Sequence, residues 1–362
     1  MIAGVYTLKV QEDIFKKGKF PAALPLALGC DMISNMTRKD MRALLFSTDV
    51  PPVLLAPMAG ITDLVFRRIC RSFGADGAVS EMVSAKALCF GDKKSRRLCE
   101  IDDSERPTGI QLFGHEPQTL AQAARIVCAF SPDWSDIHMG CPVHKVVSSG
   151  DGSALMRDPK LIFRIVQAVT REVDLPVTVK LRAGIGGVEN AVECAQAAQE
   201  GGAAAVAVHG RMREQFYAPS ADWGVIARVK RAIDISVFAN GDIDSPSAAL
   251  EALAQTGADG LMVGRAALGN PFLFEQIKAA LLGMPEVPPP SPHRRLEVAR
   301  RHIHELVQLK GEHIGMLEAR GHMGWYFKGM RGAASLREKC NKLTTIQELD
   351  TLIDEAISMQ KG

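Results

Sequence analysis

The stretch DIHMGCPVHKVVSSGDGS, residues 136–153, sets the interpretation of the whole chain. An apolar run ends in Gly140-Cys141-Pro142, and a segment rich in Gly and Ser follows it. A cysteine between Gly and Pro directly after a strand-like run is expected on a loop, with its thiol free to face a ligand. Most cysteines are inert buried thiols. Cys141 is a candidate catalytic residue because of its placement on this loop.

Seven further apolar runs of similar length surround this stretch. The eight runs cover residues 53–57, 77–81, 109–114, 135–140, 176–182, 204–210, 236–242 and 259–265. Helical apolar spacing follows them over residues 63–73, 117–130, 159–173, 190–200, 223–232 and 245–255. This alternation predicts βα units in a parallel sheet. The count of eight favours a closed α/β TIM barrel over an open doubly wound sheet, and no GxGxxG follows the first run.

The rest of the chain divides by composition. We predict a barrel over residues 51–284, a Pro-rich linker, PEVPPPSP, over residues 285–292, and a small C-terminal helical bundle over residues 293–362. Residues 1–50 lack clear periodicity and are interpreted as an N-terminal extension.

Composition excludes several classes of protein. The formal net charge of the 362 residues is +2, so a nucleic-acid partner would need a local basic patch. The eight cysteines form neither a CxxC pair nor a Cys/His cluster with zinc spacing. This argues against a disulfide framework or a metal site and favours the cytoplasm. No apolar run approaches the roughly 20 residues of a membrane helix, and no protein partner is evident.

Polar residues stand at the ends of the predicted strands, where a barrel carries its functional site. Glycines in Asn240-Gly241-Asp242 and Gly264-Arg265 would let backbone N–H groups approach a phosphate. Gln111, Lys180 and Asn240 could reach the heteroatoms of a flat ring. Together they indicate a site for flavin mononucleotide (FMN), although Lys180 alone is more often a solvated lysine and His209 alone more often structural.

Several motifs resemble those of the flavin-dependent tRNA-dihydrouridine synthases, and in particular the bacterial B-type subfamily. They are LAPMAGITD (55–63), IQLFG (110–114), MGCP (139–142), GDGSALM (150–156), VTVKLR (177–182), VHGR (208–211), NGDI (240–243), GRAALGNP (264–271) and GHMGWYFKGMRGAASLR (321–337). The resemblance begins near Val53 and extends to the C-terminus, where it implies a helical tRNA-binding domain.

The resemblance implies that NADPH, or NADH, reduces the flavin, which passes a hydride to carbon 6 of a uracil in tRNA. By motif position, Cys141 gives the proton to carbon 5; a thiol with a pKa near 8.5 is mostly protonated at neutral pH. The implied FMN-binding residues are Pro57, Met58 and Ala59 along the flavin, Gln111 and Lys180 at the ring, and His209, Asn240, Gly241, Asp242, Gly264 and Arg265 on the ribityl phosphate side.

A target uracil must leave its stack in folded tRNA to reach such a site. Six basic residues lie between Arg320 and Lys342, against the single acidic residue Glu338. Basic residues interleaved with aromatic ones suit RNA contact, and a second basic run lies at residues 93–97. The candidate tRNA contacts are His138, Arg182, Arg211, Trp325, Tyr326, Lys328 and Arg331. His138 stands where the family usually has Asn, and Met212 where Thr is common.

Two alternatives remain open at this point. A flavin barrel acting on a free pyrimidine, similar to dihydroorotate dehydrogenase, would also use a loop cysteine but would give the basic helical segment no role. A non-catalytic RNA-binding barrel would purify without flavin absorbance.

Overall fold

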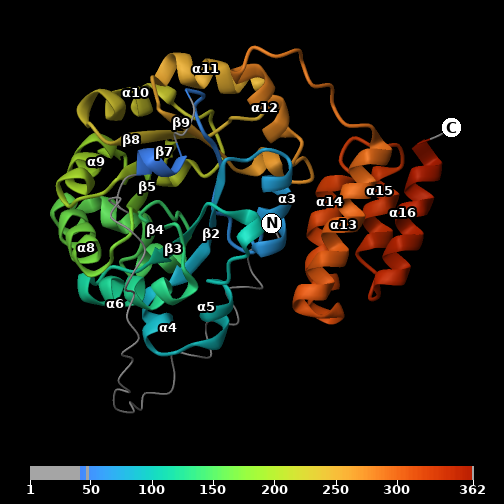
Figure 1. The fold of residues 1–362 in the computed structure, drawn as a ribbon, viewed down its shortest axis with the longest axis horizontal. Coiled ribbons are helices and arrows are strands. Elements are labelled where there is room, and N and C mark those ends of the chain that lie inside the picture. The colour runs from blue at the N-terminus through green and yellow to red at the C-terminus, as the bar shows by residue number, and fades with distance from the viewer. Residues whose placement is uncertain (1–40, 46–48, 361–362) are drawn as a thin grey trace.

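The computed structural model describes residues 41–45 and 49–360, and eight parallel strands close into a barrel in it (Figure 1). Neighbouring strands pair in the order β4-β3-β2-β1-β9-β8-β7-β5, and a further pairing of β4 with β5 closes the ring. This confirms the predicted fold, a TIM barrel followed by a helical bundle. The strands are β1 (Val53–Leu55), β2 (Gly77–Ser84), β3 (Thr108–Phe113), β4 (Trp134–His138), β5 (Val177–Ile185), β7 (Ala205–Met212), β8 (Ser236–Asn240) and β9 (Gly260–Val263).

Helices cover the outside of the barrel, and most start and end close to the predicted bounds. The outer helices are α3 (Leu64–Ser72), α6 (Pro117–Val127), α8 (Pro159–Glu172), α9 (Ala191–Glu200), α10 (Trp223–Ala232), α11 (Pro246–Thr256) and α12 (Leu273–Leu281). Helix α12 was not predicted: no helix was assigned between the last predicted strand and the Pro-rich linker at residues 285–292. Also not predicted were the short α4 (Ala85–Cys89), α5 (Lys93–Arg97) and α7 (His144–Ser148), and the antiparallel strand β6 (Val188–Glu189).

Side chains alternate along each strand between two apolar layers. Those pointing outward pack under the helices, as Val177, Val179 and Leu181 of β5 do. Those pointing inward near the strand starts form a separate core that includes Trp134 and Phe238. Helix α2 (Met41–Leu45) adds Met41 and Leu45 to this core, so it covers the N-terminal end of the barrel. The remainder of the predicted 1–50 extension lies outside the described residues, apart from residues 49 and 50.

Four helices follow the barrel: α13 (Pro292–Lys310), α14 (Glu312–Tyr326), α15 (Ala333–Cys340) and α16 (Ile346–Gln360). They lie beside α3 and share one apolar core with its outer face (Figure 1). The rings of Phe66 in α3 and His302 in α13 stack at a centroid distance of 5.5 Å. The bundle is therefore docked on the barrel next to β1 and β2.

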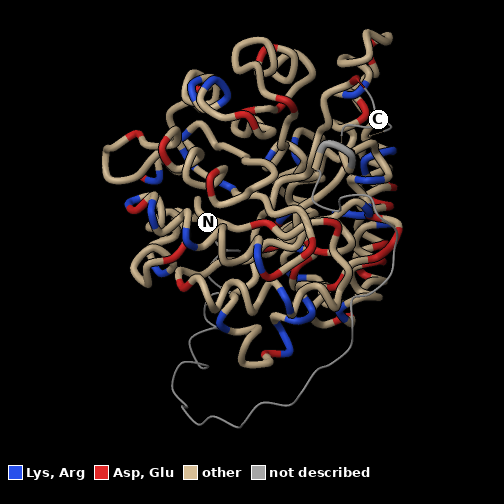
Figure 2. Tube along the Cα trace, turned by 60° about the vertical axis from the view of Figure 1, so that its left-hand side comes forward, with Lys and Arg blue, Asp and Glu red and all other residues tan. Residues whose placement is uncertain are grey.

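Within the described part of the chain, no helix combines the length and apolar character needed to cross a membrane. The same residues contain no group of three or more His, Cys, Asp or Glu side chains arranged to hold a metal ion. Lys and Arg are interspersed with Asp and Glu along the trace (Figure 2).

Candidate functional site at the barrel mouth

Because all eight barrel strands run in parallel, their C-terminal ends meet at one end of the barrel, called the mouth here. The structure brings most of the predicted site residues together there. Gln111, Lys180, Arg182 and Asn240 are buried, with exposed fractions of 8% or less. Pro57 and Met58 are partly exposed and Ala59 is exposed on the loop after β1. The mouth thus combines a polar interior with an accessible rim.

Cys141 lies on the loop between β4 and α7, as predicted, and is 4% exposed. Its carbonyl oxygen accepts hydrogen bonds from the backbone N–H of Ser153 (3.2 Å) and from the Ser153 hydroxyl (2.8 Å). Gly152, with φ of +61°, packs so closely that a Cβ there would lie 2.7 Å from Cys141 Cβ. The GDGS segment therefore fixes the position of the thiol. Burial raises the pKa of Cys141 above its ordinary value, which keeps the thiol protonated at neutral pH.

Lys180 points into the barrel and donates a hydrogen bond from Nζ to Asn240 Oδ1 at 2.8 Å. Asn240 in turn donates to the carbonyl oxygen of Met262 at 2.7 Å. Burial lowers the pKa of Lys180 to about 7, and the positive charge of Arg182 acts in the same direction. An ammonium group in this position would be stabilised by an anionic or electron-rich ligand, since the surrounding protein only partly compensates its charge.

Asp136 lies below Lys180 and orients Gln111. Its carboxylate accepts hydrogen bonds from Gln111 Nε2 (2.7 Å) and Thr178 Oγ1 (2.5 Å). Burial raises the pKa of Asp136, against the effect of these two hydrogen bonds. Asp136 was not among the predicted site residues, although a carboxylate inside an apolar strand is a usable signal.

A second polar cluster follows the ends of β7 and β8. Arg211 is 2% exposed and binds both carboxylate oxygens of Asp242, at 2.8 and 2.6 Å. It also donates to the carbonyl oxygen of Pro219 at 2.7 Å and lies 3.2 Å from His209 Nε2. Because these protein groups engage Arg211, we revise its predicted tRNA contact to a role in positioning Asp242 and His209. Burial lowers the pKa of His209 to about 2, so its ring is neutral.

Arg265 lies at the rim of this cluster. Its guanidinium is 3.4 Å from Asp242 Oδ1 and stacks 4.0 Å from the centre of the Tyr217 ring. Tyr217 is 59% exposed. It was not predicted as a site residue, because its neighbours in the loop after β7 form no motif that we could assign. Gly264 faces the other side: a Cβ there would lie 3.6 Å from Ala56 Cβ and 3.9 Å from Met58 Sδ.

His138 and Arg182 complete the mouth on the Cys141 side. The two residues lie on the paired strands β4 and β5, where His138 is opposite Lys180. Arg182 donates to the carbonyl oxygens of Gly140 (2.9 Å) and Met212 (3.0 Å). His138 Nδ1 is buried and lacks a hydrogen-bond partner among the described residues. Burial lowers the pKa of His138 to about 3, so a neutral ring presents an unused polar atom inside the mouth.

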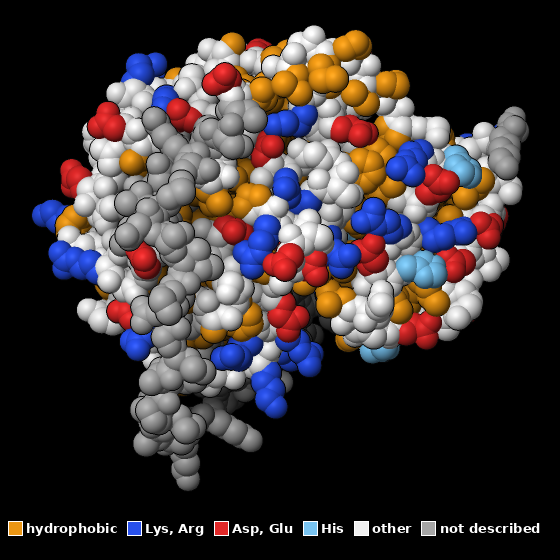
Figure 3. Space-filling model, viewed as in Figure 1, with side chains coloured by type: hydrophobic (Ala, Val, Ile, Leu, Met, Phe, Trp, Pro, Cys, Tyr) orange, Lys and Arg blue, Asp and Glu red, His pale blue; other side chains and the backbone are white. Residues whose placement is uncertain are grey.

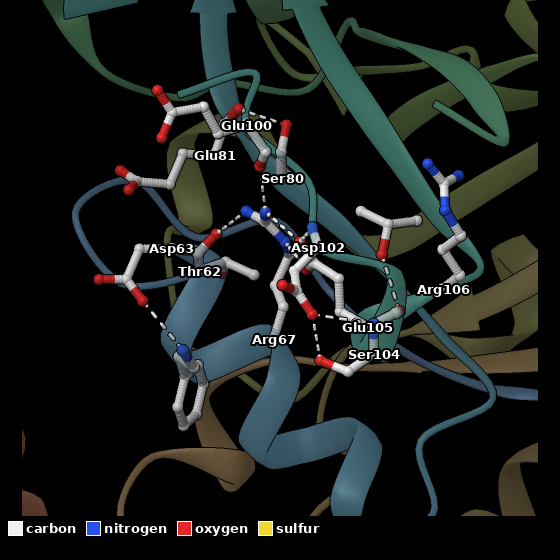
Figure 4. A network of polar contacts seen from close by, with 12 residues as sticks. Thr62, Asp63, Arg67, Ser80, Glu81, Glu100, Asp102, Ser104, Glu105 and Arg106 are labelled. Atoms are coloured by element: carbon white, nitrogen blue, oxygen red, sulfur yellow. Dashed lines mark hydrogen bonds and ion pairs between the residues drawn. The ribbon is translucent and has the colours of Figure 1, made fainter. Parts of the chain in front are cut away.

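The loop between β1 and α3, which carries Pro57 to Ala59, is held from below. Thr62 Oγ1 accepts from the backbone N–H of Met58 at 2.8 Å and donates to the carbonyl oxygen of Ala56 at 3.1 Å. Arg67 donates to the carbonyl oxygen of Thr62 at 3.0 Å and forms a buried ion pair with Glu105 (Figure 4). The loop that forms the rim next to β1 is therefore held in place by the hydrogen bonds of Thr62 and Arg67.

The helical bundle does not place all of the predicted RNA contacts at its surface. Tyr326 is fully buried, with its hydroxyl 3.2 Å from His302 Nδ1, so the predicted RNA contact of Tyr326 is wrong. The basic and aromatic pattern did not reveal that this helical position faces the core. Lys328 and Arg331 are exposed, and Trp325 is partly buried.

Several other basic side chains on the bundle are paired with acidic ones. Lys342 pairs with Glu338 at 3.0 Å, and Lys339 pairs with Glu355. In the view of Figure 3, basic and acidic side chains alternate over the bundle. By contrast, the basic residues of α5 on the barrel are exposed. Of the predicted RNA contacts on the bundle, the structure therefore leaves Lys328, Arg331 and Trp325 at least partly exposed.

Comparisons with known proteins agree with this geometry. A family model described as Dihydrouridine synthase (Dus) matches residues 54–361. The tRNA-dihydrouridine synthase B of Xanthomonas campestris pv. campestris is 42% identical over 299 residues, covering 82% of this chain and 90% of that protein. The probable tRNA-dihydrouridine synthase 1 of Synechocystis sp. is 42% identical over 311 residues, covering 85% of this chain and 87% of that protein.

A likeness to a solved structure concerns the fold alone. Histamine dehydrogenase from Rhizobium sp. 4-9 matches with a TM-score of 0.51 at 11% sequence identity. The match covers 90% of this chain and 65% of that chain.

Proposed function

Because the chain belongs to the dihydrouridine synthase family, we propose that it reduces uridines of tRNA to dihydrouridine at the barrel mouth, with FMN as its cofactor. The observation that supports this most directly is the family match over most of the chain, combined with a loop thiol beside a polar mouth. tRNA is accordingly the proposed substrate, and the cytoplasm the proposed place of action.

The residues of the mouth suit FMN. Gln111 and Lys180 would hold the polar edge of its ring, and the absence of a side chain at Gly264 leaves room beside Met58. Gly241, Asp242, Gly264 and Arg265 would hold the phosphate side, where backbone N–H groups and a cation favour an anion. His209 would line this side as a neutral ring. When bound and reduced by NADPH or NADH, FMN supplies a hydride to carbon 6 of the uracil ring.

The protein's own residues would then complete the reduction. Cys141 Sγ would donate the proton to carbon 5, because burial keeps the pKa of this thiol above neutral pH. Arg182 would hold the Cys141 loop through the carbonyl oxygen of Gly140. His138 would offer its unused Nδ1 to the substrate base, in place of the Asn that the family usually has.

RNA binding would use exposed cations and a partly exposed ring of the bundle, namely Lys328, Arg331 and Trp325. Such contacts to phosphates carry affinity but little sequence information. The choice of the target uridine would therefore depend on how the bundle orients the tRNA over the mouth.

The proposal is tested with Cys141→Ala. We expect the variant to keep flavin reduction by NADPH and to lose dihydrouridine formation by about 100-fold or more, the usual contribution of a general acid. Dihydrouridine in tRNA incubated with the protein is measured by mass mapping. Unchanged dihydrouridine formation would contradict the role of Cys141, and an unmodified tRNA with the wild-type protein would contradict the proposed function.

A further inference from the structure

Glu81 of β2 is a buried acid that no step of the proposed reaction uses. It is 6% exposed, and its Oε2 accepts a hydrogen bond from the backbone N–H of Gly60. Gly60, with φ of +75°, is at the turn of the loop between β1 and α3. Burial raises the pKa of Glu81 to about 7, although the hydrogen bond from Gly60 acts to lower it. A carboxyl group near half-protonation thus holds this turn.

The loop that Glu81 holds is the one that would line FMN. The hydrogen bonds of Thr62 brace the loop at Ala56 and Met58. Gly60 lies between these braced points and the start of α3, so its N–H bond to Glu81 fixes the exposed part of the turn. Without that acceptor, the Gly60 N–H group would lose its partner, and the turn would keep only its remaining bonds, among them those from the Ile61 and Thr62 N–H groups to the Met58 carbonyl oxygen (both 3.0 Å).

The helical bundle contacts the residues beside this carboxyl group. Lys310, near the end of α13, donates 2.6 Å hydrogen bonds to both Asp63 and Glu318. Asp63 caps α3 by accepting from the N–H of Phe66 at 2.9 Å. Figure 4 shows Asp63 and Glu81 on one side of Arg67, with Glu105 on the other.

Three charged groups outside β2 act on Glu81: Asp63 on the barrel, and Lys310 and Glu318 on the bundle. Asp63 and Glu318 act to raise its pKa, and Lys310 acts to lower it. The buried rings of His302 and His322 face Asp63 in turn. The bundle therefore contributes one cation and one anion to the environment of Glu81.

We propose that Glu81 is a positioning residue that fixes the cofactor-lining turn through Gly60, and that Lys310 and Glu318 couple the docked bundle to this turn. The inference rests on the proposed function, since it assigns FMN to the mouth. Its consequence is that FMN retention depends on pH through Glu81 and on the charges that the bundle presents.

The first test measures the rate of FMN release from the intact holoprotein, followed by flavin fluorescence after dilution. We expect Glu81→Leu to release FMN roughly tenfold faster, because the partly buried N–H of Gly60 loses its acceptor. Wild-type release should slow by roughly threefold between pH 6 and 8, since an ionised acceptor forms the stronger hydrogen bond. Glu81→Gln keeps an acceptor but cannot ionise, so it should lack that part of the pH dependence.

Lys180 titrates in the same pH range, but it is present in both wild type and Glu81→Gln. The difference in FMN release between these two proteins therefore reports on Glu81. Identical release from wild type and Glu81→Gln at every pH would overturn the inference, as would unchanged release from Glu81→Leu. A protein that neither carries nor takes up FMN would overturn the inference and the proposed function together. A protein that shows the expected release rates but leaves tRNA unmodified would support the inference and contradict the proposed activity alone.

The coupling to the bundle is tested with two changes of opposite sign. Lys310→Gln removes the cation and should move the midpoint of the pH dependence upward. Glu318→Gln removes an anion and should move it downward, and this variant remains informative if Lys310→Gln does not fold. Lys310→Arg keeps the charge and is the matched control. A midpoint unaffected by either charge change would overturn the coupling.

Discussion

Gly152→Ala should displace the thiol of Cys141, the proposed proton donor, without altering it. At φ of +61° an Ala is strained, and its Cβ would approach Cys141 Cβ to 2.7 Å and the Cys141 carbonyl oxygen to 3.1 Å. A separation below about 3 Å forces the neighbour to move, and here the neighbour is the Cβ of Cys141. The variant should therefore fold, but with the Cys141 loop shifted away from its position.

Gly150→Ala is the matched control, because it shares the loop and the positive φ, +90°, yet its Cβ would lie 3.6 Å from the His115 ring. Both variants should lose about 1–2 kcal/mol of unfolding free energy from the left-handed backbone. Only Gly152→Ala should also lose activity, by roughly 100-fold, the effect of misplacing a reacting group by about 1 Å.

The assay combines urea unfolding with single-turnover dihydrouridine formation at saturating tRNA. If Gly150→Ala and Gly152→Ala lost stability and activity in equal measure, the effect would be general strain, and the specific packing of Gly152 on Cys141 would be refuted. Full activity of Gly152→Ala would refute it equally.

Three further predictions concern the interior, the brace and the bundle. Between pH 7 and 10, Lys180 keeps its proton in the unfolded ligand-free chain but loses it in the folded protein, so the free energy of unfolding should rise with pH. The rise is at most about 1.4 kcal/mol per pH unit. Lys180→Met should remove it, as measured by urea unfolding at several pH values. Arg67→Met should lower the free energy of unfolding by about 3–5 kcal/mol, because it leaves the Glu105 carboxylate buried without its ion-pair partner. An unchanged thermal unfolding transition would contradict this. The double variant Lys328→Gln, Arg331→Gln should reduce the slope of log affinity for tRNA against log salt concentration by roughly 1.5. Lys342→Gln should change this slope less, because Lys342 is already paired with Glu338. Equal effects would refute the assignment of Lys328 and Arg331 as tRNA contacts.

The barrel could be predicted from sequence because each strand is a short apolar run followed by a helix with its own periodicity. The residues at the strand ends could be listed for the same reason, since parallel strands bring their ends together. Cys141 was identified because Gly140 and Pro142 mark the loop that carries it.

What sequence could not supply was the pairing of distant residues. Asp63 and Lys310 are 247 positions apart, and only the docking of α13 on α3 brings them within 2.6 Å. Burial was also mispredicted at Tyr326. Its basic neighbours suggested an exposed position, whereas the packing of α14 against α13 places its ring in the core. The raised pKa of Glu81 likewise depends on burial that no local pattern encodes.

One strand, β5, sets three levels of the barrel interior in succession, with Thr178 on Asp136, Lys180 on Asn240 and Arg182 on the Cys141 loop. Because these three residues are spaced two apart on one strand, the register of β5 places all of them at once. Inserting one residue at the start of β5, ahead of Val177, would turn Val177, Val179 and Leu181 inward and send the polar side chains under the helices. Substitutions can alter these levels one at a time, but insertions and deletions cannot, so variation in length is expected in the loops around β5 rather than within it.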